Sequence, residues 1–154
     1  MKLSKKYSGV IVPAITPLTE RLQIDEAAVE KLFGNFYDQG IAPFILGTTG
    51  EAASIPFQVK KDYIHAAERI KKPGTLLYAG IGSNVLAEST SLAAYCALHG
   101  VDVLVATLPT YYSLTELQMK EYFTELANTV PLPLFIYNIP ATTHMSIPLQ
   151  LVEE

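Results

Sequence analysis

The segment PFILGTTGE, residues 43–51, is a short apolar run that ends in two threonines bracketed by glycines. An apolar run of this length is typical of a strand in a parallel sheet that is covered on both faces. The turn after it can point several backbone N–H groups at one spot, and such a nest, with the Thr48 and Thr49 hydroxyls, suits a small carboxylate. A tight turn in which the threonines cap the next helix fits the same residues equally well. The segment alone leaves both interpretations open.

Four further runs share this near-continuous apolar pattern, and all five predict parallel strands. Their starts recur every 27–33 residues along the chain. Pro13 lies inside the first run and weakens that strand or places it beside a bulge, because proline cannot donate to the ladder. The five predicted strands are Val10–Ile15, Pro43–Leu46, Thr75–Ala79, Asp102–Ala106 and Leu132–Tyr137.

The segments between these runs carry apolar residues at helical spacing, which predicts a helix after each strand. We expect Asp25 to cap the first helix, Asn84 to cap the third, and Gly100 to end the third. Ser113 and Glu116 have the spacing of a capping box for the fourth helix. The predicted inward faces are Val29, Leu32, Phe33 and Phe36 in the first helix, Val59, Tyr63, Ile64 and Ala67 in the second, and Met119, Tyr122, Phe123 and Leu126 in the fourth.

This order of elements fits two α/β folds. A (β/α)8 barrel of about 250 residues has roughly 31 residues in each unit, which matches the spacing, although five units are too few to close it. A flavodoxin-like, doubly wound sheet also places five βα units in about 150 residues. Periodicity does not decide between the two, so the motifs at the strand ends must.

The composition is that of one globular domain. The chain has 154 residues, of which 49% are hydrophobic and 17% charged, enough for a substantial core. Its net charge of -4 argues against nucleic acid as a partner. We expect no signal peptide and no membrane span, and therefore a cytoplasmic protein. Cys96 is the single cysteine, which excludes an intrachain disulfide and a metal site built on thiolates.

Two other strand ends carry tyrosines. Tyr111 and Tyr112 follow the fourth run, where they can serve proton transfer or pack at an interface; packing is the better interpretation from the residues alone. Tyr137 ends the fifth run, at the same edge of the sheet as Thr48, because the ends of parallel strands meet there. A tyrosine at that edge can act as a general acid or base if another group hydrogen-bonds its hydroxyl, or it can pack and bond to backbone.

The sequence predicts neither a metal nor an organic cofactor. The segment Gly80–Gly82 lacks the third glycine of a dinucleotide loop, because Val85 holds that place, and no P-loop is present. His65, His99 and His144 are scattered without the spacing of metal ligands. No serine lies in a G-x-S-x-G turn, so a hydrolase nucleophile is not supported.

The motifs follow one another as TPL at 16–18, GTTGE at 47–51, GSN at 82–84, PTYY at 109–112 and YNIP at 137–140. In this order they resemble the dihydrodipicolinate synthase / N-acetylneuraminate lyase family, in register from about Gly9 to Val152. The resemblance implies parallel (β/α) units that correspond to the first five of a (β/α)8 TIM barrel. It further implies a single partial barrel domain over residues 1–154 that stops before the sixth strand.

The resemblance also implies a class I, Schiff-base aldolase or lyase. Such an enzyme acts on pyruvate or another 2-oxo acid and on an aldehyde, uses no cofactor, and assembles as a homo-oligomer, a tetramer in full-length members.

Residue by residue, Thr49 matches the group that holds the keto-acid carboxylate, together with Gly47 and nearby backbone N–H groups. Thr48 and Tyr137 match two members of a proton relay. Tyr112 matches the tyrosine that completes this relay, in many members by crossing into the neighbouring subunit. Tyr111 matches a residue that packs at that interface.

Two departures from the family pattern set further expectations. The Schiff-base lysine of the family lies on the sixth strand, beyond Glu154, so we expect this chain to be catalytically incomplete alone. True dihydrodipicolinate synthases carry an arginine two residues after the proline of YNxP, and here that position is Thr142. This favours a sugar-acid or other 2-oxo-acid aldolase.

Three functions of different classes remain open. The chain is the first part of an aldolase or lyase, or a natural half-barrel completed by self-assembly or by a partner chain, or a non-catalytic module that binds a 2-oxo acid. Co-purification with a lysine-bearing fragment tests the half-barrel, and calorimetry with pyruvate tests the binding module. Labelling with pyruvate and borohydride tests whether this chain carries the nucleophile, because borohydride fixes an imine as an amine.

Overall fold

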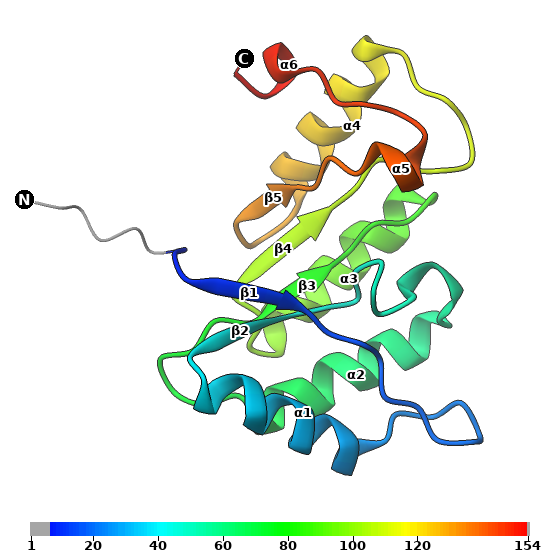
Figure 1. Cartoon of the computed structure of the whole chain (residues 1–154). Coiled ribbons are helices and arrows are strands. Elements are labelled where there is room, and N and C mark those ends of the chain that lie inside the picture. The colour runs from blue at the N-terminus through cyan, green and yellow to red at the C-terminus, as the bar shows by residue number, and fades with distance from the viewer. Residues whose placement is uncertain (1–6, 154) are drawn as a thin grey trace, which may run out of the picture. The chain divides into compact units, whose positions relative to one another are not determined.

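Strands and helices alternate along the chain in the computed structural model, which describes residues 7–153 (Figure 1). The chain divides into two compact units, Met1–Tyr78 and Ala79–Glu154. Each unit contains βα elements of its own, and the predicted site residues are distributed over both.

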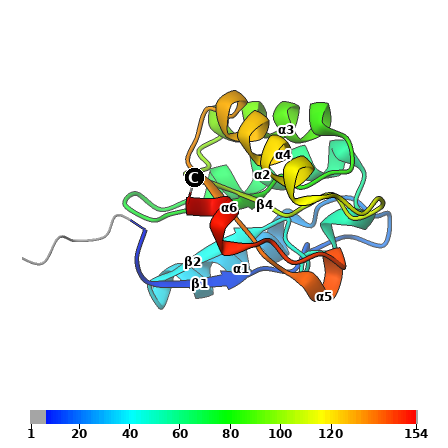
Figure 2. The same ribbon diagram turned by 90° about the horizontal axis from the view of Figure 1, so that it is seen from above.

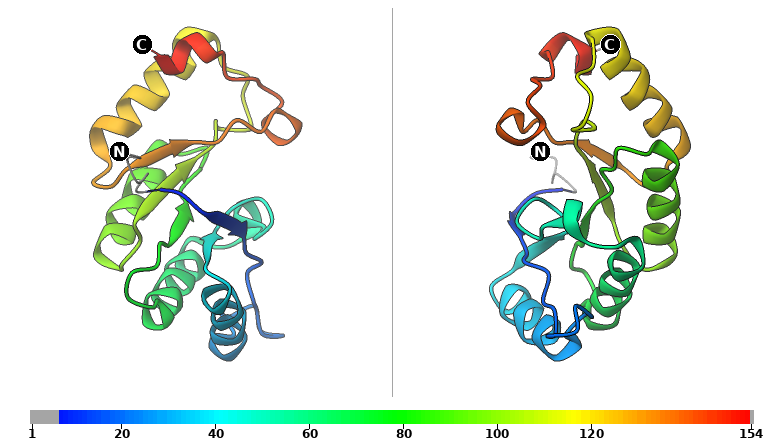
Figure 3. Two further views of the ribbon diagram at one scale, coloured as in Figure 1. Left: turned by 60° about the vertical axis from the view of Figure 1, so that its left-hand side comes forward. Right: turned by 90° about the vertical axis from the view of Figure 1, so that its right-hand side faces the viewer.

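The first unit contains two parallel strands and the helices that follow them. β1 (Val10–Pro13) pairs with β2 (Ile41–Ile45) so that Val10 lies beside Ile41 and Pro13 beside Phe44. α1 (Glu26–Asp38) joins these strands, and β2 leads through a 3₁₀ helix, η1 (Ala52–Ser54), into α2 (Phe57–Ile70). α1 and α2 lie side by side (Figure 3).

An N-cap residue and a stripe of apolar residues determine the position of α1 in the sequence. The Asp25 carboxylate accepts a hydrogen bond from the Ala28 N–H at 3.0 Å, which confirms the predicted N-cap. Val29 and Phe33 are fully buried, four residues apart on one face of the helix. The Phe33 ring packs 6.3 Å from the ring of Tyr63 on α2. These contacts bury the facing sides of the two helices.

The second unit continues the alternation from β3 (Tyr78–Gly80), which begins at the boundary. α3 (Leu86–Leu98) leads to β4 (Val103–Ala106), and α4 (Glu116–Thr129) leads to β5 (Leu134–Ile136). β4 and β5 are parallel, and α3 and α4 lie side by side (Figure 2). Two short helices follow, α5 (Pro140–Thr143) and α6 (Leu149–Glu153).

The strand order in the sheet is β1-β2-β3-β4-β5. A doubly wound sheet would place the first strand between the second and third, so the flavodoxin-like alternative is wrong. Sequential parallel order is the order of a (β/α)8 barrel, and the described residues supply five of its eight strands. The fold prediction, a partial TIM barrel, is therefore confirmed. β1 and β5 end the strand order, and on β1 Val10 is 60% exposed.

Two predicted caps in the second unit are wrong. Asn84 precedes α3, whose N-cap is Val85 without a side-chain bond, and the Asn84 side chain binds backbone elsewhere. The capping box of α4 is formed by Thr115 and Gln118 and not by Ser113 and Glu116. Gly100 does follow the end of α3, with a φ of 69° that suits glycine.

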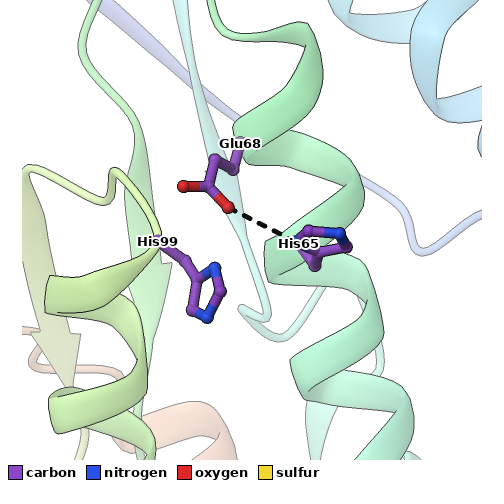
Figure 4. A group of neighbouring side chains, drawn as sticks. All are labelled: His65, Glu68 and His99. Carbon is purple, nitrogen blue, oxygen red and sulfur yellow. Dashed lines mark hydrogen bonds and ion pairs between the residues drawn. The ribbon is translucent and has the colours of Figure 1, made fainter.

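Ionisable side chains of the first unit pair on its surface. Arg69 of α2 lies 2.8 Å from Glu26 of α1, and both side chains are exposed. On α2 itself, His65 lies 3.3 Å from the Glu68 carboxylate, one turn later (Figure 4). Such exposed pairs contribute little to stability. Among the described residues, no helix has the length and apolar character needed to cross a membrane.

Candidate functional site

The turn after β2 presents two threonines to solvent. Gly47 to Ala52 form a tight backbone turn in which the N–H groups of Gly50 and Ala52 both donate to the Gly47 carbonyl oxygen, at 3.1 and 3.3 Å. The Glu51 N–H donates to the Thr48 carbonyl oxygen at 3.0 Å. Within the described residues, the N–H and hydroxyl groups of Thr48 and Thr49 meet no acceptor, and both residues are exposed. The turn therefore keeps these four donors available.

The alternative role of these threonines, as helix caps, is wrong. η1 begins after Glu51 and α2 begins after Pro56, and neither helix receives a side-chain cap. The left-handed backbone positions of the turn are taken by Leu46 and Glu51, with φ of 56° and 53°. Non-glycine residues rarely adopt this conformation, which costs energy and is often found where a loop is held in place for function.

The glycines of this turn are required by packing. A Cβ on Gly50 would lie 3.0 Å from the Ala14 carbonyl oxygen and 3.1 Å from the Thr16 hydroxyl. A Cβ on Gly47 would lie 2.9 Å from the Phe44 ring. The missing side chain of Gly50 therefore lets the turn lie close to the segment after β1. The missing side chain of Gly47 lets it lie close to β2.

Tyr111 and Tyr112 project from the segment between β4 and α4. Their side chains are 76% and 74% exposed, and their rings meet edge to face with centroids 4.8 Å apart. The Asn84 side-chain oxygen accepts hydrogen bonds from the backbone N–H groups of Thr110 and Tyr111, at 2.8 and 3.2 Å. An exposed tyrosine pair on a tethered backbone is a surface suited to contact another molecule.

Tyr137 follows β5 directly and extends the pairing of that strand. Its N–H donates to the Ala106 carbonyl oxygen of β4 at 2.8 Å, and its side chain is half-buried. The next residue, Asn138, accepts a hydrogen bond from the Ile147 N–H at 3.2 Å through its side-chain oxygen. This bond closes the loop that contains α5, so Tyr137 lies at the base of a closed loop.

The predicted site residues thus fall into two groups. Gly47, Thr48 and Thr49 share the turn after β2 in the first unit, while Tyr111, Tyr112 and Tyr137 follow β4 and β5 in the second. Every one of them comes after the carboxyl end of a strand, which is where parallel α/β folds bind ligands. The described lysines, in contrast, lie on α1, α2 and α4 or directly after α2: Lys31, Lys60, Lys61, Lys71, Lys72 and Lys120.

Sequence reasoning missed the supporting contacts of Thr16, Asn84 and Asn138. Thr16 binds backbone across 34 residues and Asn84 across 26. In the sequence, these three residues stand out only because they belong to the TPL, GSN and YNIP motifs. The motifs do not indicate which groups the residues bind.

Comparison with known proteins assigns the chain to a family. The family model described as "Dihydrodipicolinate synthetase family" matches residues 6–154. The chain belongs to this family. The resemblance drawn from the motifs is thereby confirmed, and the match covers nearly the whole sequence.

Curated relatives in this family are 4-hydroxy-tetrahydrodipicolinate synthases. The protein of Campylobacter fetus subsp. fetus is 31% identical over 147 residues, which cover 94% of this chain and 49% of the relative. The protein of Helicobacter pylori strain G27 is 34% identical over 141 residues, which cover 86% of this chain and 47% of the relative. The chain thus spans about half the length of the curated relatives that it matches.

Solved structures of similar proteins share the fold. Dihydrodipicolinate synthase from Bacteroides thetaiotaomicron has a TM-score of 0.89 at 31% identity, over 95% of this chain and 49% of that one. YagE of E. coli K12, solved in complex with pyruvate, has a TM-score of 0.90 at 26% identity over the same shares. A sialic acid aldolase from Ruminococcus gnavus has a TM-score of 0.89 at 23% identity, over 97% of this chain and 50% of that one, and shows the fold alone.

Proposed function

We propose that this chain forms the first half of a Schiff-base aldolase or lyase that acts on pyruvate or another 2-oxo acid. Family membership supports the reaction class. The observation that carries the proposal is the exposed Thr48–Thr49 pair at the end of β2, whose N–H and hydroxyl donors are available to an anion. A relative of the same family was solved with pyruvate bound.

In this proposal the turn after β2 binds the carboxylate of the 2-oxo acid. Thr49 donates its hydroxyl, and the available backbone N–H groups of Thr48 and Thr49, in the turn that begins at Gly47, donate to the same anion. Converging neutral donors bind a carboxylate well, because hydrogen bonds to a charged acceptor are stronger than bonds between neutral groups.

Thr48, Tyr137 and Tyr112 are proposed as the proton relay. Tyrosine hydroxyls can donate and accept protons when a neighbouring hydroxyl stabilises the intermediate state. The 74% exposure of Tyr112 supports a role for this side chain in a second copy of the protein, with Tyr111 packing at the same contact. The proposed enzyme is therefore a homo-oligomer.

The proposed nucleophile is a lysine on the sixth strand, outside these 154 residues. Its amine adds to the ketone and water leaves, which gives a protonated imine. The imine then accepts the electron pair of the carbon–carbon bond that breaks, and no metal or organic cofactor is required.

The second substrate is proposed to be an aldehyde that binds without an arginine on α5. The curated relatives are synthases of the dihydrodipicolinate type. In this chain, however, position 142 is an exposed threonine on α5, which cannot form the bidentate pair that a guanidinium makes with a carboxylate. This supports a sugar-acid or other 2-oxo-acid aldolase.

The test is reductive trapping of the imine. The chain is incubated with pyruvate and borohydride alone, and again after co-expression with the carboxyl-terminal half of the Campylobacter fetus relative. We expect an intact-mass increase only in the second experiment, on the lysine-bearing half. A stoichiometric label on this chain alone would contradict the proposal, because another lysine would then be the nucleophile.

Paired variants separate binding from proton transfer in the completed enzyme. Thr49→Val should raise the KM for pyruvate with little change in kcat, while Thr48→Val should lower kcat. Thr124→Val, an exposed threonine on α4, is the matched control and should change neither. If Thr48→Val and Thr49→Val both behaved like the control, the turn after β2 would not be the binding site.

A further inference from the structure

The GSN motif, Gly82 to Asn84, lies between β3 and α3 and contacts the segment after β4. A Cβ on Gly82 would lie 2.8 Å from the Thr107 hydroxyl, so only glycine fits without a shift of that side chain. The motif therefore runs close against the carboxyl end of β4, the strand that leads to the tyrosine pair.

Ser83 fixes the shape of the motif. Its hydroxyl donates to the Glu88 carboxylate at 2.7 Å and accepts from the Val85 N–H at 3.1 Å. The two bonds hold the turn against the first helical turn of α3, so Asn84 projects from a braced backbone.

Asn84 uses this position to bind the tyrosine-bearing segment. Its side-chain oxygen accepts from two successive N–H groups, those of Thr110 at 2.8 Å and Tyr111 at 3.2 Å. A single acceptor shared by consecutive amides constrains both peptide planes. It therefore constrains the direction in which the Tyr111 and Tyr112 side chains leave the backbone.

The far end of the same segment is also held. The Leu114 N–H donates to the sulfur of Met145 at 3.0 Å, and Met145 is buried in the loop closed by Asn138. The segment 110–114 thus has a hydrogen-bonded anchor at each end, and it carries the exposed side chains of Tyr111 and Tyr112.

We infer that Asn84 is a positioning residue that pre-orders the Tyr111–Tyr112 pair for its contact with another copy of the chain. The anchoring itself depends only on the contacts above, whereas its consequence for catalysis rests on the proposed function of Tyr112. Ordering a loop before it binds lowers the entropy lost on binding, so the anchor should favour the docked state.

Hydrogen exchange of individual backbone amides in the 154-residue chain tests the anchor. Asn84→Ala removes the acceptor, and the exchange of the Thr110 and Tyr111 amides should accelerate by about tenfold, the order expected from losing two neutral hydrogen bonds. Asn84→Asp keeps an oxygen in place and should preserve protection. Asn128→Ala, an exposed asparagine on α4, should leave both amides unchanged.

Two results would overturn the inference. One is unchanged exchange at both amides in Asn84→Ala. The other is a uniform acceleration across α3 and α4 in both Asn84→Ala and Asn84→Asp, because the residue would then stabilise the whole unit without holding this segment. If exchange accelerated across the whole unit in Asn84→Ala but not in Asn84→Asp, the acceptor oxygen would still be responsible for the protection.

Activity of the completed enzyme separates this inference from the proposed function. With Asn84→Ala we expect a lower kcat at an unchanged KM for pyruvate, and recovery with Asn84→Asp. Faster amide exchange together with unchanged kcat would leave the anchor in place but contradict the relay role of Tyr112. Unchanged exchange would contradict the anchor whatever the activity.

Discussion

The Thr16 hydroxyl donates a hydrogen bond to the Gly50 carbonyl oxygen at 2.7 Å. This bond ties the segment after β1 to the turn that carries Thr48 and Thr49. We predict that Thr16→Val, which keeps the shape and removes the donor, lowers the free energy of unfolding by about 1 kcal/mol. Urea denaturation measures the change, and Thr16→Ser should retain most of the stability. A loss of stability in Thr16→Ser with none in Thr16→Val would mean that the methyl group and not the hydroxyl is responsible.

Gly50 and Gly34 should respond oppositely to alanine. A Cβ on Gly50 meets backbone at 3.0 Å, so Gly50→Ala should destabilise the protein by about 1–3 kcal/mol. Gly34 lies inside α1, and a Cβ added there would meet nothing within 4 Å, so Gly34→Ala should stabilise by up to about 1 kcal/mol. Thermal unfolding of the two variants is the measurement. Unchanged or increased stability in Gly50→Ala would contradict the packing of the Gly50 turn.

Thr115 should matter to α4 and Ser113 should not. The Thr115 hydroxyl accepts from the Gln118 N–H at 3.3 Å, and the Gln118 side chain accepts from the Thr115 N–H at 2.9 Å. Thr115→Ala should therefore cost about 1 kcal/mol of unfolding free energy. Ser113→Ala is the matched control with an expected change near zero. A larger loss of unfolding free energy in Ser113→Ala than in Thr115→Ala would support the capping box of Ser113 and Glu116 expected from the sequence.

The stability of the chain should fall at alkaline pH because of buried acids. Burial raises the pKa of the Cys96 thiol to about 12, while a backbone hydrogen bond opposes the rise. Burial also raises the pKa values of Tyr63 and Tyr122. In the unfolded chain the thiol ionises near pH 8.5, so the unfolded state releases its proton first and stability declines from about pH 8.5 towards pH 12.

Cys96→Ala isolates the thiol contribution to this decline. Urea unfolding at a series of pH values should show a shallower alkaline slope in the variant, with a difference on the order of 1–3 kcal/mol at the alkaline end. Parallel slopes in the variant and the parent would show that Cys96 does not ionise differently in the two states.

Tyr137→Phe tests the proposed relay. In the completed enzyme it should slow formation of the pyruvate imine by about a hundredfold or more, the range of general acid–base effects. The free energy of unfolding should change little, because the ring is preserved. Tyr95→Phe, a half-buried tyrosine on α3, is the control. Imine formation at the parent rate in Tyr137→Phe would remove this residue from the relay.

Local patterns in the sequence predict the elements better than their ends. The run Thr75–Ala79 predicts a strand, yet β3 covers Tyr78–Gly80, because an apolar pattern reports burial and not strand pairing. Leu77 is fully buried although it precedes the strand. The stretch 113–118 offers two registers of a capping box, and local spacing cannot choose between them.

The same limit applies to the candidate site. The exposed position of Thr48 and Thr49 after a strand follows from the apolar run and the glycines beside it. The bonds made by Thr16 and Asn84 do not, because their partners lie 34 and 26 residues away. An asparagine before a helix can cap that helix, or it can accept hydrogen bonds from a segment that is distant in the sequence. The tertiary fold determines which of the two bonds forms.

The outermost position of β1 bears on how this chain can be handled in solution. Among the described residues, β1 pairs with β2 alone, and Val10 and Ile11 on β1 are 60% and 38% exposed. An apolar, uncovered edge is a template on which strands of other molecules can add. Self-association through β1 would make the melting temperature depend on protein concentration, so a charged residue at position 10 is the change most apt to keep the chain monodisperse.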